Sequence, residues 1–391
     1  MRILVDQSGY ELLNLGDIAM LQVCVSRLQN LWPNADIEVL TRSPERLNQY
    51  FTGVTAVEPD IVFRKARSQR GSAVLGPKPR RLLGAVRHAD VVVSSGGGFI
   101  NDVFWRHGVR VLTLLAVAQR LGKPTAVFSQ GIGPLTHPVL ARHVAHTMPR
   151  LLVIGLREGL GGVPLLRAHR VNKELIHVTG DDALLLATAT ERPRTGTVIG
   201  LNVRVAFYSE VDQSIASQAV AITSESASRR GVTTLALPVS RYKGASDLDF
   251  IRTPGCGREG NAAGQESTDL RTPEELVERA ARCRLVVTGS YHAAVFALAA
   301  GVPAVCITKS RYYDLKFEGL GAQFPGGCHI VRPGPDFRHD LSEAIDLAWD
   351  TSESERDDIH SAARAQVAQV DQVYTRFKSL VTAAATPVNE L

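Results

Sequence analysis

The segments RILVD (residues 2–6), DIAMLQVCVSRLQNLW (17–32) and DIEVL (36–40) decide the fold class of this chain. The first and third are short runs of mostly β-branched or apolar residues, which is typical of strands, whereas the second is long enough for a helix. A strand, a helix and a strand in this order predict a βαβ unit with two parallel strands. The N-terminal part of the chain is therefore predicted to be an α/β structure.

The same alternation continues along the first half of the chain and starts again near residue 197. It runs through DVVVSS, VLTLLAVAQRLG, TAVFSQ and LLVIGLRE, and later through TVIGLNV, TTLALPVS, TPEELVERAARC, RLVVTGS, HAAVFALAAG and PAVCITK. Repeated βαβ units predict parallel sheets with helices on both faces. The polar stretch 187–196 between the two series contains Pro193 and Gly196, which is typical of a linker.

We therefore predict two α/β domains, one on each side of a cleft. The first domain spans residues 1–190 and the second spans residues 191–351. Apolar side chains recur at helical spacing from residue 352 to about residue 385. The C-terminal part, 352–391, is predicted to be a helix and a tail that pack across the domains.

The size and composition of the chain agree with two domains and exclude several classes of protein. Its 391 residues exceed the roughly 150 residues of one average domain, and a hydrophobic fraction of 45% is enough for two cores. The net charge of +5 is too small for a dedicated nucleic-acid-binding protein. It is compatible with an anionic small substrate.

The N-terminus and the cysteines indicate a cytoplasmic protein. The chain enters a strand-like run at once, without the long apolar segment and cleavage site of a signal peptide. Its five cysteines are scattered and show no C-x-x-C spacing, so neither a disulfide framework nor a zinc site is indicated. The most apolar stretch, residues 293–307, is interrupted by Gly301 and Pro303, which predicts a buried helix, a turn and a strand instead of a membrane span.

Polar residues and glycines follow several of the predicted strands in the first half. Because ligands of open α/β sheets bind beyond the carboxyl ends of the strands, these residues are candidates for substrate binding. They are Asn14, Gly16 and Asp17 after the first strand, Gly97, Gly98, Asn101 and Asp102 in GGGFIND, Gln130 and Gly131 in SQGIGPL, and Arg157 in LREG.

These candidates also have structural interpretations. Asn14 and Asp17 are suited to capping the helix that follows, and Arg157 is suited to pairing with Glu158 or with an aspartate. The glycine run 96–98 permits positive φ and exposes successive N–H groups for a phosphate. Its spacing is neither G-x-G-x-x-G nor that of a Walker A loop, so nicotinamide and ATP chemistry are not favoured.

In the second half, the strand RLVVT and a turn at Gly289 are followed by Ser290, Tyr291 and His292, which begin a predicted helix. An imidazole at a strand-to-helix junction is suited to proton transfer and to contact with an anion. The cations Lys309, Arg311 and Lys316 follow the next strand and are also predicted to bind substrate. No metal-ligand spacing and no G-x-S-x-G elbow occur in the sequence, so we predict metal-independent chemistry on an anionic substrate.

The segment from Arg64 to Arg81 contains basic residues and no acidic residue. It fits a solvated loop, and it also fits a basic flap for an anionic acceptor at a membrane surface. The predicted membrane contact is peripheral at most.

The ordered motifs NLGDIAML (14–21), SSGGGFIND (94–102), SQGIGPL (129–135), LREG (156–159), TGDDALLL (179–186) and GSYHAAVFALAAGVPAV (289–305) resemble those of the polysaccharide pyruvyl transferase family. The resemblance extends over most of the chain. It implies a GT-B-like fold, in which two Rossmann-like domains face a cleft that holds the active site.

The resemblance also implies an activity and roles for two residues. The implied reaction transfers the pyruvyl group of phosphoenolpyruvate to two sugar hydroxyls and forms a cyclic ketal, with no cofactor besides the donor substrate. The implied partners are phosphoenolpyruvate and a saccharide or glycoconjugate acceptor, either free or lipid-linked. The family's L-R-E arginine and its Arg-x-His histidine match Arg157 and His292, which are implied to act on the donor.

One position departs from the family pattern, because Ser290 stands where many members have the arginine of Arg-x-His. Either Lys309, Arg311 or Lys316 replaces that charge, or the chain uses another donor. The alternatives are a GT-B glycosyltransferase that uses a nucleotide sugar, and a non-catalytic protein that binds sugars or anions.

Overall fold

The computed structural model describes residues 1–59, 61–64, 72–75, 80–188, 196–242, 246–247 and 270–385. The chain forms two compact units. Unit 1 contains Met1–Leu12, Met20–Asp182 and Ala368–Leu391, and unit 2 contains Leu13–Ala19 and Ala183–Val367. The segment with Asn14, Gly16 and Asp17 thus belongs to the same unit as His292.

Unit 1 is built on a parallel sheet with the strand order β10-β9-β8-β6-β1-β2-β3, in which β7 also pairs with β8. The strands of this sheet are β1 (Arg2–Asp6), β2 (Asp36–Leu40), β3 (Val54–Val57), β6 (Val91–Ser94), β7 (Gly97–Ile100), β8 (Thr125–Ile132), β9 (Val153–Leu156) and β10 (Ile176–Val178). A separate antiparallel hairpin consists of β4 (Ile61–Arg64) and β5 (Ser72–Leu75).

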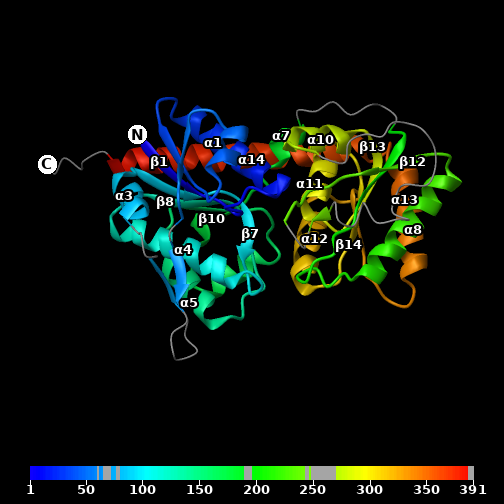
Figure 1. The fold of residues 1–391 in the computed structure, drawn as a ribbon, viewed down its shortest axis with the longest axis horizontal. Helices are drawn as coiled ribbons and strands as arrows, with labels where there is room; N and C mark the ends of the chain where they lie inside the picture. Colours follow the sequence, from blue (N-terminus) through cyan, green and yellow to red (C-terminus); the bar gives the residue numbers. More distant parts are fainter. Residues whose placement is uncertain are drawn as a thin grey trace. The chain divides into compact units, whose positions relative to one another are not determined.

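The helices of unit 1 follow the strands in alternation (Figure 1). They are α1 (Leu15–Leu31), α2 (Pro44–Tyr50), α3 (Arg80–His88), α4 (Trp105–Arg120), α5 (Pro138–Thr147) and α6 (Gly162–Ala168), the short 3-10 helices η1 (Met148–Arg150) and η2 (Lys173–Leu175), and the C-terminal part of α14 (Arg356–Ala385). Helices α1 and α14 are therefore each divided between the units.

The core of unit 1 forms because the strands are apolar on both faces. All eight residues of β8 are buried. On one face Val127 packs in a cluster with side chains of α4 and α5, such as Leu112 and Leu140. On the other face Phe128 stacks on Tyr374 of α14, with ring centroids 3.9 Å apart. Near-continuous apolar runs such as this are typical of parallel strands that helices cover on both sides.

Unit 2 contains a second parallel sheet, with the order β12-β11-β13-β14-β15. Its strands are β11 (Val198–Asn202), β12 (Thr233–Ala236), β13 (Cys283–Thr288), β14 (Ala304–Ile307) and β15 (Cys328–Val331). Its helices are α7 (Leu184–Thr188), α8 (Gln213–Arg229), α10 (Pro273–Ala281), α11 (Tyr291–Ala299), α12 (Arg311–Gln323), α13 (Phe337–Thr351) and the first part of α14. Helices α8 and α13 pack against each other, and α10 packs against α11 (Figure 1).

The stretch 293–307 lies inside unit 2 as the sequence predicted. Every residue of α11 is buried, Gly301 has a positive φ of 74° in the turn, and β14 follows. The apolar composition of this stretch therefore reflects burial against the second sheet. Among the described residues, no helix combines the length and the apolar character that a membrane crossing requires.

The strand orders locate the edge of each sheet where a ligand is expected. In unit 1 the chain runs outward from β1 to β2 and β3, and then returns to the other side of β1 with β6. In unit 2 it runs from β11 to β12 and returns beside β11 with β13. Ligands of doubly wound sheets bind at such a reversal, beyond the carboxyl ends of the two strands.

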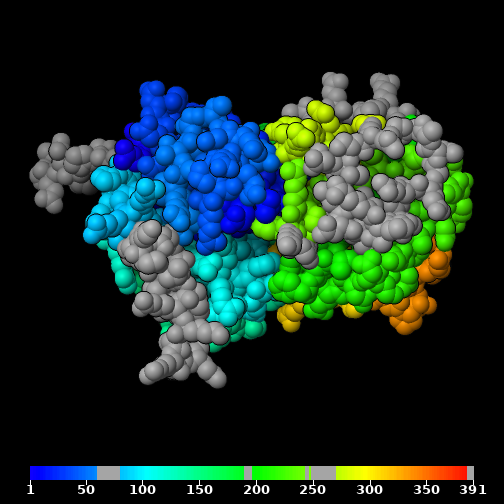
Figure 2. Space-filling view, in the orientation of Figure 1, coloured from blue at the N-terminus to red at the C-terminus, as the bar shows by residue number. Residues whose placement is uncertain are grey.

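The prediction of an α/β chain with two Rossmann-like units is confirmed. The helix predicted from residue 352 begins at Arg356 and ends at Ala385. Most of the predicted linker, residues 189–195, lies outside the described residues. The same holds for most of the basic segment, residues 65–71 and 76–79. Arg80 and Arg81 are exposed at the start of α3, which lies at the surface of unit 1 (Figure 2).

Candidate functional site

The candidate site of unit 2 lies at the carboxyl ends of β11 and β13. The backbone N–H of Gly289 donates to the carbonyl of Asn202 (2.9 Å), which ties the loop after β13 to the end of β11. The N–H of Ser290 donates to Thr288 Oγ1 (2.8 Å). Ser290 is fully buried, and its hydroxyl has no hydrogen-bond partner in the described part of the chain.

His292 in the first turn of α11 packs directly against the backbone of Gly16. A Cβ atom at position 16 would lie 2.5 Å from the Cβ of His292 and closer still to its ring. Only 7% of the His292 surface is exposed. The sequence placed these two residues in separate motifs, and the structure brings them into contact because glycine leaves room for the imidazole.

Asn14 and Asp17 hold the segment that carries Gly16. Asn14 Oδ1 accepts hydrogen bonds from the N–H groups of Gly16 (2.9 Å) and Asp17 (3.2 Å), so Asn14 caps α1 as in its structural interpretation. The segment is anchored further by the N–H of Leu15, which donates to the carbonyl of Val239 (2.9 Å). These bonds fix the wall against which His292 packs.

A buried ion pair, Arg204 with Asp247, lies beside this junction and was not predicted from the sequence. Arg204 Nε and Nη2 donate to the two carboxylate oxygens of Asp247 at 2.9 Å each. Asp247 also accepts from the Asn202 side chain (2.8 Å) and from the N–H groups of Val239 (2.8 Å) and Ser240 (3.0 Å). This carboxylate therefore joins the ends of β11 and β12.

Arg204 holds two tyrosines next to the ion pair. Burial disfavours its charge, but Asp247 outweighs that effect and the pKa of Arg204 lies well above its usual value. The rings of Tyr208 and Tyr313 are nearly parallel, with centroids 6.2 Å apart, and both hydroxyls form hydrogen bonds with Arg204. Burial raises the pKa of both phenols, so they stay protonated near neutral pH.

Arg204 lies two residues after the end of β11, so its position near a strand end is a signal that the sequence does contain. Asp247 carries no comparable signal, because it lies in a polar stretch without periodicity. Its role is visible only once the chain has folded back onto β11.

The three predicted cations after β14 lie in two environments. The ammonium of Lys316 on α12 lies 3.8 Å from the ring centroid of Tyr312, 4.9 Å from that of Tyr313 and 5.8 Å from that of Tyr291. Lys309 and Arg311 are exposed. Lys316 is thus the cation held against Tyr291, the neighbour of His292.

The candidate site of unit 1 contains Arg157 at the carboxyl end of β9. Its side chain is 1% exposed, and its guanidinium lies 3.9 Å from the carboxylate of Asp181, which confirms the predicted contact with an aspartate. A Cβ atom on Gly131 would lie 2.7 Å from Arg157 Nε, so glycine is needed for the guanidinium to pack on β8. The N–H of Arg157 donates to the carbonyl of Gln130 (3.2 Å).

The glycine run 96–98 does not have the conformation of a phosphate-binding loop. None of the three glycines has a positive φ, and Gly97 and Gly98 are part of β7. The side chain of Gln130 donates to the carbonyl of Gly97 (2.5 Å). A Cβ atom on Gly97 would overlap the ring of Phe99, so the absence of a side chain serves close packing.

Asn101 and Asp102 stabilise turns in unit 1. Asn101 donates to the carbonyl of Gly98 (2.6 Å) and accepts from the N–H of Phe104 (2.9 Å). Asp102 accepts from the N–H groups of Thr136 (2.8 Å) and His137 (2.8 Å). These bonds connect the loop after β7 to the loop after β8.

Asp6 is a buried acid of unit 1 that the sequence analysis did not select. It ends β1 at the strand reversal and is fully buried, and the N–H of Gln7 donates to its Oδ1 (2.9 Å). Burial raises the pKa of Asp6 to about 7, although a hydrogen bond with Tyr10 opposes the shift. A carboxyl with this pKa can exchange a proton near neutral pH.

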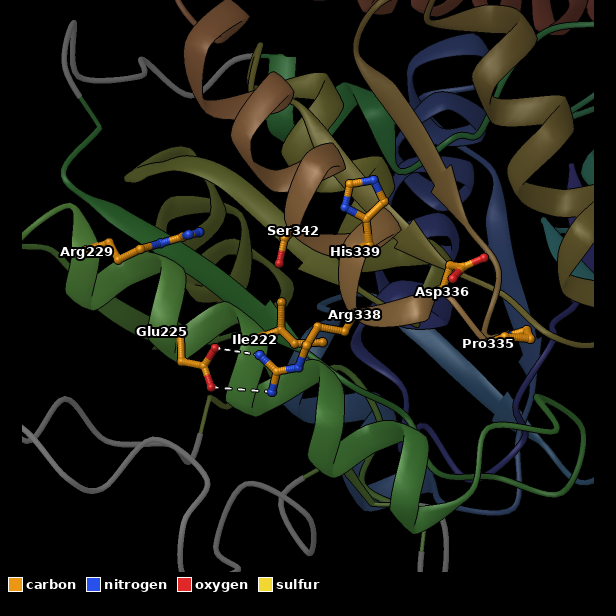
Figure 3. Close-up of a pocket in the computed structure, with 8 residues that line it drawn as sticks. All are labelled: Ile222, Glu225, Arg229, Pro335, Asp336, Arg338, His339 and Ser342. Atoms are coloured by element: carbon orange, nitrogen blue, oxygen red, sulfur yellow. Dashed lines mark hydrogen bonds and ion pairs between the residues drawn. The ribbon is translucent and has the colours of Figure 1, made fainter.

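A surface pocket of about 490 Å³ in unit 2 lies apart from the sequence-predicted residues. Ile222 and Glu225 of α8 and Ser342 of α13 are among its lining residues. Arg338 donates to Glu225 (2.8 Å) across it (Figure 3). Within the described residues, no group of three or more His, Cys, Asp or Glu side chains is arranged to hold a metal ion.

Comparison with known proteins gives a family and a fold for this chain. Residues 14–311 match the family profile described as polysaccharide pyruvyl transferase. No protein with a curated description has a significantly similar sequence.

Solved structures with a similar fold include the UDP-GlcNAc 2-epimerase of Methanocaldococcus jannaschii, which is 13% identical with a TM-score of 0.54, over 89% of this chain and 93% of that one. The HepE protein of Anabaena, in complex with UDP and glucose, is 13% identical with a TM-score of 0.55, over 98% of this chain and 99% of that one. A UDP-glucosyltransferase from Polygonum tinctorium is 10% identical with a TM-score of 0.54, over 96% of this chain and 98% of that one. The fold is therefore GT-B-like.

Proposed function

Because the chain belongs to the polysaccharide pyruvyl transferase family and is therefore a transferase, we propose that it moves the pyruvyl group of phosphoenolpyruvate onto a saccharide acceptor. The product is a cyclic ketal between the pyruvyl carbon and two sugar hydroxyls. The observation that carries this proposal is the contact between His292 and Gly16 at the carboxyl edge of the second sheet. It holds an imidazole at the point where a doubly wound sheet binds its ligand.

His292 is the proposed general acid. Its imidazolium protonates the methylene carbon of phosphoenolpyruvate, and positive charge develops at the carbon that carries the phosphate. One sugar hydroxyl attacks this carbon and returns its proton to the imidazole. The bond to the phosphate oxygen then breaks, the second hydroxyl closes the ketal, and the departing phosphate takes the second proton. The products are the ketal and inorganic phosphate, and no metal takes part in the proposed steps.

The donor carries a carboxylate and a phosphate, so its binding requires cations. Of the three candidate cations that follow β14, Lys316 is supported best, because aromatic rings hold its ammonium beside Tyr291. We assign to Lys316 the charge that the family's arginine supplies where this chain has Ser290. Arg157 is the proposed second donor-binding residue, since a guanidinium can exchange a carboxylate partner for a substrate anion.

Calorimetric titration with phosphoenolpyruvate, beside UDP and GDP under the same conditions, tests the donor. We expect phosphoenolpyruvate to bind, and Arg157→Ala to weaken this binding by about 2 kcal/mol, the value of a desolvated charge-assisted pair. Binding of UDP or GDP without any response to phosphoenolpyruvate would contradict the proposal and favour a nucleotide-sugar glycosyltransferase.

Phosphate release from phosphoenolpyruvate in the presence of acceptor tests the role of His292. We expect His292→Gln to lower turnover by at least about 100-fold, the usual contribution of a general acid, with an unchanged melting temperature. His339→Gln on α13 is the matched control, because this histidine is exposed and lies outside the site. Equal turnover in the two variants would show that His292 is not the general acid and has a structural role only.

A further inference from the structure

One aromatic side chain of unit 2 is far more exposed than its apolar surface favours. Phe207 has 82% of its surface exposed, whereas the next most exposed large apolar side chain in the described part of the chain, Leu160, has 53%. An exposed aromatic ring forgoes the free energy that burial of its apolar surface would provide. Phe207 follows β11, so the ring stands at the edge of the second sheet where a ligand is expected.

The loop that carries Phe207 is held in place by hydrogen bonds. The N–H and the hydroxyl of Ser209 both donate to the carbonyl of Ala206, at 2.9 and 2.7 Å. Ser310 Oγ, at the start of α12, donates to the carbonyl of Tyr208 (2.9 Å) and ties the loop to the carboxyl edge of β14. The ring of Phe207 is therefore presented on a fixed support, which lowers the entropy cost of binding a ligand.

The neighbouring Tyr208 connects Phe207 to the wall of the candidate site. The two rings meet edge to face, with centroids 5.3 Å apart. Burial raises the pKa of the Tyr208 phenol, and the carboxylate of Asp17 is near enough to add to the shift. Asp17 follows Gly16, the glycine on which His292 packs. Phe207 thus lies near the junction that holds the proposed general acid.

The charges next to the ring suit a neutral ligand with many hydroxyls. Residues 205–212 include two exposed carboxylates, Glu210 and Asp212, and no lysine or arginine. Carboxylate oxygens accept hydrogen bonds from hydroxyls and repel phosphate groups. The cations Lys309 and Arg311 instead flank Ser310 in the loop after β14, where the anionic donor is expected.

We propose that Phe207 packs against the apolar face of a neutral pyranose ring of the saccharide acceptor. One face of such a ring presents C–H groups, which pack on the negative face of an aromatic ring, while its hydroxyls are available to the carboxylates. The inference rests on the proposed function, because it names the class of acceptor for the same site. Phe207 contacts a sugar ring and none of the reacting atoms, so it determines acceptor affinity and leaves the chemical step unchanged.

Saturation-transfer NMR and calorimetric titration of the full-length protein with neutral disaccharides (lactose, maltose, cellobiose and N,N′-diacetylchitobiose) test the site. We expect at least one to bind, with the strongest saturation on the C–H protons of one sugar face. Phe207→Ala should weaken this binding by at least about tenfold, because apolar contact area is lost, whereas Phe207→Trp should retain it. Since the ring is exposed, neither substitution disturbs the core. Leu347→Ala on α13 is the matched control, because it removes another exposed apolar side chain of the same unit.

Absence of disaccharide binding, or equal affinity in wild type and Phe207→Ala, would overturn the inference. A wild-type dimer that Phe207→Ala separates in analytical ultracentrifugation would also overturn it, because the ring would then serve a contact between copies of the chain. Titration with phosphoenolpyruvate tests the donor separately, and here Phe207→Ala should match the wild type. If disaccharide binding depends on Phe207 while phosphoenolpyruvate does not bind, the acceptor site stands and the proposed donor fails.

Discussion

The two units each bury an arginine against an aspartate, and the two pairs differ in geometry. In unit 1, Arg157 and Asp181 lie 3.9 Å apart, beyond hydrogen-bond distance. In unit 2, Arg204 and Asp247 form two hydrogen bonds of 2.9 Å, and Asp247 accepts three more. The two hydrogen bonds between Arg204 and Asp247, with the three further bonds to Asp247, hold strand ends together, whereas Arg157 and Asp181 are in contact by charge without such a bidentate pair. The comparison separates a candidate binding residue from a positioning one.

The largest expected effect is on the tighter pair. Asp247→Ala should lower the free energy of unfolding by about 5 kcal/mol, because it leaves Arg204 buried without its counter-charge. Asp181→Ala should cost about 2 kcal/mol, since the longer contact contributes less Coulomb energy. Urea unfolding of the two variants measures the difference. Equal losses would show that the two geometries are energetically equivalent.

Asp6, another buried acid of unit 1, sharpens the comparison. A proton neutralises Asp6, whereas an arginine neutralises the charge of Asp247. The native state keeps the Asp6 proton up to a pKa of about 7, whereas the unfolded chain loses it near 3.8. The native state therefore binds more protons between these values, and stability is lost as pH rises through that range. The loss attributable to Asp6 is about 4 kcal/mol.

Asp6→Asn tests this pH dependence. The variant should lose less stability than the wild type between pH 4 and pH 7, as measured by urea unfolding at several pH values. Asp36→Asn on the neighbouring strand is the control, because its side chain is exposed. A pH profile of Asp6→Asn that matches the wild type would mean that Asp6 ionises as readily in the native state as in the unfolded chain.

The smallest expected effects concern the two glycines that make room for site residues. Gly16→Ala should cost about 2 kcal/mol, because the added methyl meets the rigid ring of His292. At Gly131→Ala the methyl meets the far end of Arg157, which can shift, so about 1 kcal/mol is expected. Thermal melting measures both, and a larger loss at Gly131 would show that Arg157 is held more rigidly than His292.

Local patterns in the sequence predicted most of the fold. Strands such as RILVD and TAVFSQ are apolar without interruption, and burial on both faces of a parallel sheet requires this pattern whatever the order of the strands. Strand-end positions likewise indicated Arg157 and His292, because a βα junction places its residues at the carboxyl edge wherever the strand lies in the sheet. Asn14 and Asp17 likewise indicated the start of a helix, because a capping residue is recognised from its neighbours in the chain.

Tertiary structure decided which of these positions meet. The packing of His292 on Gly16, the ion pair of Arg204 with Asp247 and the packing of Arg42 on the ring of Tyr10 each join residues from different elements. Their energies come from burial and from charges at short range, which depend on distance in space and leave no periodic trace in the chain. The conformation of glycines 96–98 is a further case, because pairing of β7 with β8 determined it and local composition did not.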